Sequence, residues 1–193
     1  MAVEIEAKMA VEDLQAVRAT LERHGAARLG AFLETNTFFD SEDRSLMAAD
    51  KGLRLRLSRN TETGDEDHIL TWKGPRQHGP LKSREEVEVA VEGSAEAARL
   101  LECLGFQRMI SFEKRRESWT LEGCRVELDE VPYLGTYVEV EGPDDNTVMR
   151  VRRLLGLENR PLIKYGYVAL LQGYLQERGR PRGDVRFDDV KQS

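Results

Sequence analysis

Polar and apolar residues alternate strictly in several short stretches of the chain. The first is VEIEAK, Val3 to Lys8, in which Glu4, Glu6 and Lys8 are separated by small or apolar residues. Because successive side chains of a β-strand point to opposite faces, this pattern predicts a strand with one apolar and one charged face. A single strand of this kind is usually half exposed to solvent. The other strands decide whether these charges have a reason to face inward.

The same two-residue period recurs along the chain and predicts more strands. They span residues 33–39, 53–59, 68–73, 84–91, 110–121, 124–131 and 136–142. Apolar residues at helical spacing predict helices over residues 11–24, 94–104, 147–155 and 168–178. Ser94 is the expected N-cap of the second helix, and Gly25 and Gly105 are the expected stops of the first two.

Two segments carry no such period. GPRQHGP, Gly74 to Pro80, predicts a loop, which is either a mobile lid or simply a long turn. The polar residues 179–193 predict a flexible C-terminal tail that follows a single domain over residues 1–178.

A weak internal repeat links the two halves of the chain. VEIEAKMAVEDLQAVRATLERHGA and EVEVAVEGSAEAARLLECLGF each read as an alternating acidic strand, a helix and a glycine turn. The repeat suggests two related halves within one sheet system. Chance similarity between two amphipathic strand–helix pairs is the alternative.

The charged residues of the predicted strands share one face in each strand. These residues are Glu4, Glu6, Lys8, Arg54, Arg56, Lys73, Arg84, Glu86, Glu88, Lys114, Arg116, Glu127, Asp129, Glu139 and Glu141. A solvated sheet face usually mixes in Ser, Thr and Gln, whereas these faces are almost purely ionic. Since helices pack against an apolar face, the sequence predicts an α+β fold. Its centre is a closed or nearly closed antiparallel β-barrel, with helices outside and a charged lumen.

Composition restricts the class of protein further. The 193 residues are 40% hydrophobic and 33% charged, which is typical of a globular domain, and the formal net charge is −6. That charge argues against a protein that coats nucleic acid or a membrane. The sequence shows neither a membrane-spanning run nor a signal peptide. Cys103 and Cys124 are expected to be free thiols in a reducing cytoplasm, and the three scattered histidines argue against zinc.

A lumen lined by both signs of charge favours a particular chemistry. Carboxylates that face one another repel and need cations, and their hard oxygen atoms suit Mg²⁺ or Mn²⁺. Arginine and lysine side chains in the same lumen need anions, and phosphates fit their donors. A divalent metal together with a polyphosphate would give the carboxylates a cation and the basic side chains an anion. The chain has no P-loop, GxGxxG or kinase signature, so phosphates are not expected at a helix N-terminus.

The strand VEIEAK resembles the ExExK signature of the CYTH superfamily, the triphosphate tunnel metalloenzymes. The similarity continues in order through LRLR, TWKGP, SREEVEV, EKRRESW, VELDEVPYLGTYVEVEG and KYGYVALL, and it covers about residues 2–175. TWKGP, SREEVEV and LDEVPYLGTYVEVE are most similar to the branch of class IV adenylyl cyclases. The resemblance implies an eight-stranded antiparallel tunnel, Mg²⁺ or Mn²⁺, and a substrate that bears a triphosphate.

The resemblance also implies roles for single residues. The implied metal ligands are Glu4, Glu6, Glu139 and Glu141, with Asp129, Glu86 and Glu88 near a second metal. The implied phosphate-binding residues are Lys8, Arg54, Arg56, Lys73, Arg84, Lys114 and Arg116, and the implied catalytic residues are Lys8, Lys73 and Asp129. For each of them the alternative is an ion pair that only stabilises the lumen. Glu127 lies on the same charged strand face as Asp129, but no role is assigned to it. Where the family usually has a Ser–Tyr pair in the final helix, this chain reads Gly166–Tyr167.

The sequence therefore predicts a divalent-metal-dependent enzyme that acts on a triphosphate. The favoured activity is that of a class IV adenylyl cyclase, which converts ATP into cyclic AMP and pyrophosphate. The alternatives are a triphosphatase for inorganic or thiamine triphosphate and a non-catalytic module that binds polyphosphate or nucleotide. The expected partner is the small triphosphate, with no nucleic acid and no membrane, and a homodimer is compatible with the sequence. Phe38, Phe39 and Trp72 either recognise a base or pack against helices.

Overall fold

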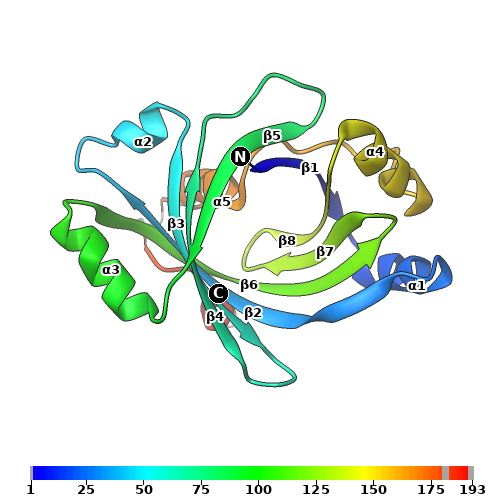
Figure 1. The fold of residues 1–193 in the computed structure, drawn as a ribbon, viewed down its shortest axis with the longest axis horizontal. Coiled ribbons are helices and arrows are strands. Elements are labelled where there is room, and N and C mark those ends of the chain that lie inside the picture. Colours follow the sequence, from blue (N-terminus) through cyan, green and yellow to red (C-terminus); the bar gives the residue numbers. More distant parts are fainter. Residues whose placement is uncertain (1, 180–182, 191–193) are drawn as a thin grey trace.

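The computed structural model describes residues 2–179 and 183–190. Its strands form a closed antiparallel barrel in the order β1-β5-β4-β3-β2-β6-β7-β8 (Figure 1). The strands are β1 (Ala2–Val11), β2 (Ala27–Asp40), β3 (Gly52–Asn60), β4 (Glu66–Lys73), β5 (Lys82–Ala90), β6 (Gln107–Leu121), β7 (Cys124–Val131) and β8 (Gly135–Gly142). The eight-stranded antiparallel barrel predicted from the sequence is confirmed.

The helices lie around the barrel (Figure 1). They are α1 (Leu14–Arg23), α2 (Ser45–Ala48), α3 (Ser94–Cys103), α4 (Asp145–Leu154), α5 (Tyr167–Glu177) and α6 (Phe187–Val190). None of the helices in the described ranges has the length and apolar character needed to span a membrane. The four-residue helix α2 has no counterpart in the sequence prediction, because one turn is too short to show a period.

The main hydrophobic core lies between the outside of the barrel and two helices. Val17 and Leu21 of α1 and Val148 and Val151 of α4 are buried against the outward side chains of β1, β7 and β8, which include Met9. These outward residues alternate with the charged ones, so the apolar faces of these three strands pack under helices as the sequence predicted, whereas Val87 and Val89 on the outward face of β5 are exposed. A smaller cluster fixes α3 on β2 and β3.

Capping groups set where two of the helices begin. Asp13 accepts hydrogen bonds from the backbone N–H groups of Gln15 and Ala16, so α1 begins at Leu14 and not at Val11, which ends β1. The prediction that Ser94 caps α3 is wrong, since Gly93 is the N-cap residue and Ser94 is already helical. The hydroxyl of Ser94 instead contacts Nδ1 of His68 on the neighbouring strand β4.

The strand order agrees with the internal repeat. If each strand is exchanged for the one four places away in sequence (β1 with β5, β2 with β6, and so on), the cyclic order becomes the same order read backwards. This is the behaviour of a pseudo-two-fold axis perpendicular to the barrel. The repeated pieces β1–α1 and β5–α3 therefore occupy equivalent places, and β1 and β5 lie side by side.

Helix α5 and the C-terminal segment close part of one end of the barrel. Tyr167 and Leu171 of α5 are buried with Phe112 and Tyr137, which project from the inner face of the barrel. Val185, in the segment predicted to be a flexible tail, is also buried there.

The chain around Val185 pairs with β6. Its N–H donates to the carbonyl of Ser111 at 2.8 Å, and its carbonyl accepts from the N–H of Glu113 at 2.9 Å. This edge of β6 is available because β7 pairs with β6 only as far as Arg115. The described part of the tail, residues 183–190, thus packs on the barrel, whereas the sequence analysis predicted a flexible tail. Residues 180–182 and 191–193 lie outside the described part.

Candidate active site in the barrel lumen

The barrel encloses a cavity of about 710 Å³ that is lined by residues from all eight strands. Most of the site residues predicted from the sequence line it: Glu4, Glu6, Lys8, Arg54, Arg56, Lys73, Arg84, Glu86, Glu88, Lys114, Arg116, Glu139 and Glu141. Glu127 also lines the cavity, whereas Asp129 does not. The two-residue period thus placed the charged faces inside the barrel.

Carboxylates predominate on some strands of the lumen and basic side chains on others. Glu4 and Glu6 of β1 and Glu139 and Glu141 of β8 lie on adjacent strands and are called the acidic wall below, whereas Arg54 and Arg56 of β3, Lys73 of β4 and Arg84 of β5 are called the basic wall. In the register of β1 with β8, Glu6 lies opposite Glu141 and Lys8 lies opposite Glu139. In the register of β1 with β5, Glu4 lies opposite Arg84. The two walls therefore meet where β1 pairs with β5, and Lys8 and Lys82 place positive charge beside the carboxylates of the acidic wall.

Glu4 and Glu86 form a coupled pair at the border of the two walls. Burial, together with the hydrogen bond that Glu86 shares with Glu4, raises the pKa of Glu86 to about 7. Burial opposes ionisation of Glu4 as well, but Lys73 and other partners outweigh it and lower the pKa of Glu4 to about 2. Lys73 lies 3.7 Å from Glu4 and contacts Glu86 directly. The pair holds one proton up to about neutral pH.

Among the described residues, Glu141 makes no ion pair with a lysine or arginine. Burial, followed by the negative charges of Glu4 and Glu6, raises its pKa to about 7, and the opposing charges of Arg116 and Arg125 do not outweigh them. The ionised form of Glu141 is thus disfavoured in the folded chain.

Lys8 is the most deeply enclosed of the predicted basic residues. Its Nζ lies 3.0 Å from Glu139 and 3.6 Å from Glu6, and it donates a hydrogen bond to the carbonyl of Tyr165 at 3.2 Å. Burial acts against its charge, but Glu139 and Glu6 outweigh burial and raise its pKa. Lys8 therefore stays protonated and is a fixed positive charge beside the acidic wall.

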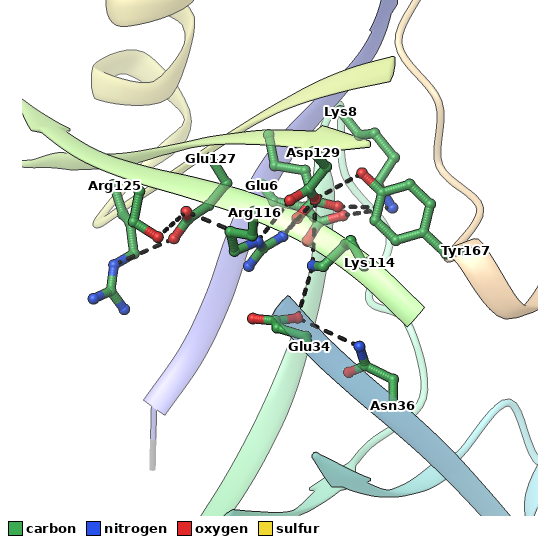
Figure 2. A network of polar contacts seen from close by, with 12 residues as sticks. Glu6, Lys8, Glu34, Asn36, Lys114, Arg116, Arg125, Glu127, Asp129 and Tyr167 are labelled. Carbon is green, nitrogen blue, oxygen red and sulfur yellow. Dashed lines mark hydrogen bonds and ion pairs between the residues drawn. The ribbon is translucent and has the colours of Figure 1, made fainter. Parts of the chain in front are cut away.

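Asp129 lies behind the cavity wall, at the centre of the network in Figure 2. Its side chain is fully buried, and its two oxygens accept hydrogen bonds from Arg116 at 2.7 and 2.6 Å. Lys114 donates to it at 3.3 Å, and the hydroxyl of Tyr167 donates at 2.9 Å. Both oxygens of Asp129 are thus engaged by protein groups, and the metal-binding and catalytic roles that the sequence suggested for it remain predictions. It holds Arg116 and Lys114 in position.

Glu34 and Asn36 are inward residues of β2 that the sequence analysis did not single out, and of the two only Asn36 lines the cavity. Buried Glu34 lies 3.1 Å from Lys114 and 3.7 Å from Arg56, and Asn36 donates to it at 3.4 Å (Figure 2). Burial works against its charge, but Lys114 and then Arg116 lower the pKa of Glu34 far below its usual range. The period of two in LETNTFF, residues 33–39, places Glu34 and Asn36 on one face of the strand and could have identified both.

Two further basic residues of the lumen were missed. Lys82 lies two positions before Arg84 on β5, and its Nζ is 2.8 Å from Glu6. Arg125 lies two positions before Glu127 on β7, and its Nε is 3.4 Å from Glu127. Both continue the inward phase of their strands and could have been found by extending that phase by one step.

Three arginines in the lumen have donors to spare. The Nε atoms of Arg54, Arg56 and Arg84 are buried and lack a hydrogen-bond partner among the described residues. Burial, and next the neighbouring charge of Arg56, lowers the pKa of Arg54. Buried donors without partners are costly. This sector is therefore suited to an anion that accepts several hydrogen bonds at once.

The acidic wall fits a hard divalent cation in its chemistry. The buried oxygens Oε2 of Glu4 and Oε1 of Glu6 make ion pairs with lysines but lack a hydrogen bond within the described residues. Carboxylate oxygens of this kind are the ligands that Mg²⁺ and Mn²⁺ prefer. No three His, Cys, Asp or Glu side chains of the described residues already form a ready-made cluster.

The model of the CYTH domain family matches residues 2–164 of the chain. The chain therefore belongs to the CYTH domain family, whose members generally process triphosphates. A provisionally named adenylate cyclase of Methanocaldococcus jannaschii is 27% identical over 179 residues, which cover 87% of this chain and 98% of that protein.

Solved structures agree with this assignment at the level of the fold. A protein of Pyrococcus horikoshii OT3 has a TM-score of 0.76 and 24% identity over 89% of this chain and 99% of its own. A protein of Hippeastrum, named as an adenylyl cyclase with a dominant triphosphatase activity, has a TM-score of 0.55 and 21% identity over 94% of this chain and 89% of its own.

Gly166, which stands where the family usually has serine, is the N-cap residue of α5 and provides no side-chain cap. A Cβ atom added there meets nothing within 4 Å. We expect Gly166→Ser to raise the melting temperature by about 1 °C, because serine caps a helix better than glycine by only a few tenths of a kcal/mol. Thermal denaturation followed by circular dichroism measures this shift. A loss of several degrees would contradict the open space at this position.

Proposed function

We propose that this protein is a divalent-metal-dependent enzyme that acts on a triphosphate bound inside the barrel. One observation carries the proposal. Buried guanidinium donors without partners on β3 and β5 lie in the same cavity as buried carboxylate oxygens without hydrogen bonds on β1. A metal–triphosphate complex supplies acceptors to the first set and positive charge to the second.

In this proposal the basic wall binds and orients the phosphates. Arg54, Arg56 and Arg84 offer hydrogen-bond donors to the phosphate oxygens. Two basic side chains of β6 lie in the same cavity. Glu34 holds Lys114, and Asp129 holds Arg116. When bound, the metal supplies positive charge that stabilises the charge developing on the phosphates. Glu4, Glu6, Glu139 and Glu141 are the residues that would hold it, with Glu86 and Glu88 nearby.

The pair formed by Lys73 and Glu86 is the proton acceptor that we propose. Burial, and next the charge of Arg54, lowers the pKa of Lys73, while the pKa of Glu86 is raised to about 7. Groups whose pKa lies near the working pH are suited to general acid–base chemistry. The pair would take the proton from the hydroxyl group or water that attacks phosphorus.

For the particular reaction, we propose ATP cyclisation. The ribose 3′-hydroxyl attacks the α-phosphorus, the bond from that phosphorus to the bridging oxygen breaks, and the products are cyclic AMP and pyrophosphate. The similarity of TWKGP, SREEVEV and LDEVPYLGTYVEVE (residues 71–75, 83–89 and 128–141) to class IV adenylyl cyclases supports this choice, and so does the name of the Methanocaldococcus jannaschii relative. The name of the Hippeastrum protein shows that a cyclase name can accompany triphosphatase activity, which makes hydrolysis the competing reaction.

One experiment separates these functions. The purified protein is incubated with Mn²⁺ or Mg²⁺ and either ATP, thiamine triphosphate or inorganic triphosphate, and the products are resolved by chromatography. Cyclic AMP with equimolar pyrophosphate is the expected result. ADP and phosphate without cyclic AMP, with faster turnover of inorganic or thiamine triphosphate, would identify a triphosphatase. Tight triphosphate binding without any product over hours would identify a non-catalytic module.

Arg56→Ala should weaken triphosphate binding and leave metal binding intact, because Arg56 lies on the basic wall. The loss of hydrogen bonds to a charged group, about 1.5–3 kcal/mol, corresponds to a ~10- to 150-fold rise in Kd. Calorimetric titration with inorganic triphosphate measures this change. Arg59→Ala, on the same strand but largely exposed, is the matched control and should bind like the wild type. Equal losses in both variants would show that Arg56 acts only through the stability of β3.

A further inference from the structure

A relay of side chains leads from the basic wall to the mouth of the cavity beside α2 and α5. Arg84 lies 3.6 Å from Oδ1 of Asp50. Asp50 accepts hydrogen bonds from the backbone N–H and the Nε of Arg76, at 2.9 and 3.0 Å. The guanidinium of Arg76 lies 5.8 Å from the centre of the Tyr165 ring. All four residues line the cavity, so the relay joins the phosphate-binding wall to an aromatic side chain at the rim.

The loop GPRQHGP is part of this rim. Its first and middle residues are tied to β5, because the N–H of Gly74 donates to the carbonyl of Glu85 at 2.8 Å and the N–H of Gln77 donates to that of Ser83 at 2.7 Å. The side chain of Lys164 donates to the carbonyl of Gly79 at 2.9 Å. These contacts place Arg76 of the loop beside the segment that carries Tyr165.

Tyr165 differs from the other aromatic residues that line the cavity. Its backbone carbonyl accepts the hydrogen bond from buried Lys8, yet the residue as a whole is 59% exposed. Phe38 and Phe112, in contrast, stack on each other with centroids 6.2 Å apart, and Phe112 also packs edge-on against Tyr167. The ring of Tyr165 is therefore the aromatic surface of the cavity that is most open to a ligand.

Most of the apolar part of the cavity lining lies at the same end of the barrel. This part lies where β2 ends, β6 begins and α2 and α5 lie, and it includes Phe38, Met47, Met109, Ile110, Phe112 and Val168, whereas Val3 lies at the other end. At the opposite end, the lining residues are mainly charged and include Glu88, Arg125 and Glu141. A substrate with a charged chain and an aromatic head would thus place its head at the end that carries Tyr165.

We infer that this mouth is a nucleobase subsite, in which the base stacks on the ring of Tyr165 beside the guanidinium of Arg76. The inference rests on the proposed function and specifies a nucleoside triphosphate as the substrate class. Stacking on an aromatic ring and contact with an arginine plane are the usual means of holding a base. Inorganic triphosphate has no group that reaches this subsite.

The structure also shows where the three aromatic residues lie that the sequence analysis considered as base contacts. Phe39 borders the cavity but is only 2% exposed and is buried with Leu101 of α3 in the outer cluster, so its ring is not open to a base. Trp72 is on the outward face of β4, one residue before the inward Lys73, and does not line the cavity. Phe38 faces the cavity with its ring stacked on Phe112.

The test compares two ligands on two variants. The Kd values of a non-hydrolysable ATP analogue and of inorganic triphosphate are measured by calorimetry in the presence of Mg²⁺ for the wild type, Tyr165→Ala and Tyr165→Phe. Base–aromatic stacking contributes about 1–3 kcal/mol, so Tyr165→Ala should bind the ATP analogue ~5- to 150-fold more weakly and inorganic triphosphate within about twofold. Tyr165→Phe keeps the ring and should restore binding of the analogue. Leu100→Ala, exposed on α3, is the control for unrelated surface changes.

Each other outcome overturns a specific statement. If Tyr165→Ala weakens both ligands equally, residue 165 acts through Lys8 and the phosphates, and the base subsite is wrong. If it changes neither ligand, the base binds elsewhere. If Tyr165→Phe fails to restore binding, the hydroxyl and not the ring makes the contact. If the wild type binds neither ligand, the proposed function fails, and this result is distinct from the failure of the subsite alone.

Discussion

Asp129→Ala should lower the free energy of unfolding by about 3–5 kcal/mol, the usual cost of removing one partner from a buried ion pair. Asp129 is fully buried, and its oxygens bind Arg116, Lys114 and Tyr167. Without it, two buried cations lose a shared counter-charge, and Tyr167 loses the acceptor that ties α5 to the barrel. Urea denaturation followed by circular dichroism, without added metal, measures the change.

Two further variants show whether the carboxylate or its neighbourhood is responsible. Asp129→Asn keeps the shape and an acceptor oxygen, so its loss should be smaller than that of Asp129→Ala. Glu130→Ala, the next residue on β7, removes an exposed pair with Arg115 and should cost at most about 1 kcal/mol. If Asp129→Ala keeps wild-type stability and loses only the stabilisation that Mg²⁺ provides, Asp129 is a metal ligand and the positioning role is wrong.

The barrel could be predicted because the information lies within each strand. In KGLRLRLS and TYVEVEG the period of two is enough to separate Arg54 and Arg56, or Glu139 and Glu141, from the residues between them. A charged face this pure has no explanation in a solvated sheet. Closure around a lumen follows from the need to give the apolar face to the helices.

The pairing of charges could not be predicted in the same way. Which cation meets which carboxylate depends on the register between strands, and one strand contains no information on its register with the next. Asp129 and Glu127 have the same phase on β7, yet only Glu127 lines the cavity. The difference arises because Arg116 of the neighbouring strand lies directly opposite Asp129.

The contacts of the cavity mouth and of the C-terminal segment could not be predicted from the sequence for a different reason. Residues 74–80 and 183–190 have no period, and their positions are set by single contacts such as Arg76 with Asp50 and Val185 with β6. Contacts between residues far apart in sequence leave no local pattern. The composition of residues 179–193 is polar on average, and this average conceals buried Val185.

Glu141→Gln should abolish most activity and, unlike Asp129→Ala, stabilise the fold at alkaline pH. The pKa of Glu141 in the folded chain is about 7, above its ordinary value of 4.5, so the folded chain disfavours the ionised form. The stability that this group contributes is complete below its unfolded pKa and is lost as the pH rises through about 7. The neutral amide avoids this loss, and the gain at pH 8 should be on the order of 1–3 kcal/mol, shrinking towards pH 5.

The same substitution should reduce the response to metal. In the wild type, Mg²⁺ or Mn²⁺ would neutralise Glu141 and raise the melting temperature more at pH 8 than at pH 6, whereas Glu141→Gln should show a much smaller rise. Turnover of ATP should fall at least ~100-fold, as altering groups that only support metal ligands already costs 10- to 100-fold. Glu85→Gln, on the outward face of β5, is the control and should match the wild type in all three measurements. A Glu141→Gln protein that is less stable at pH 8 without metal would show that Glu141 has a counter-ion in the lumen, and the assignment of the acidic wall as the metal site would then fail.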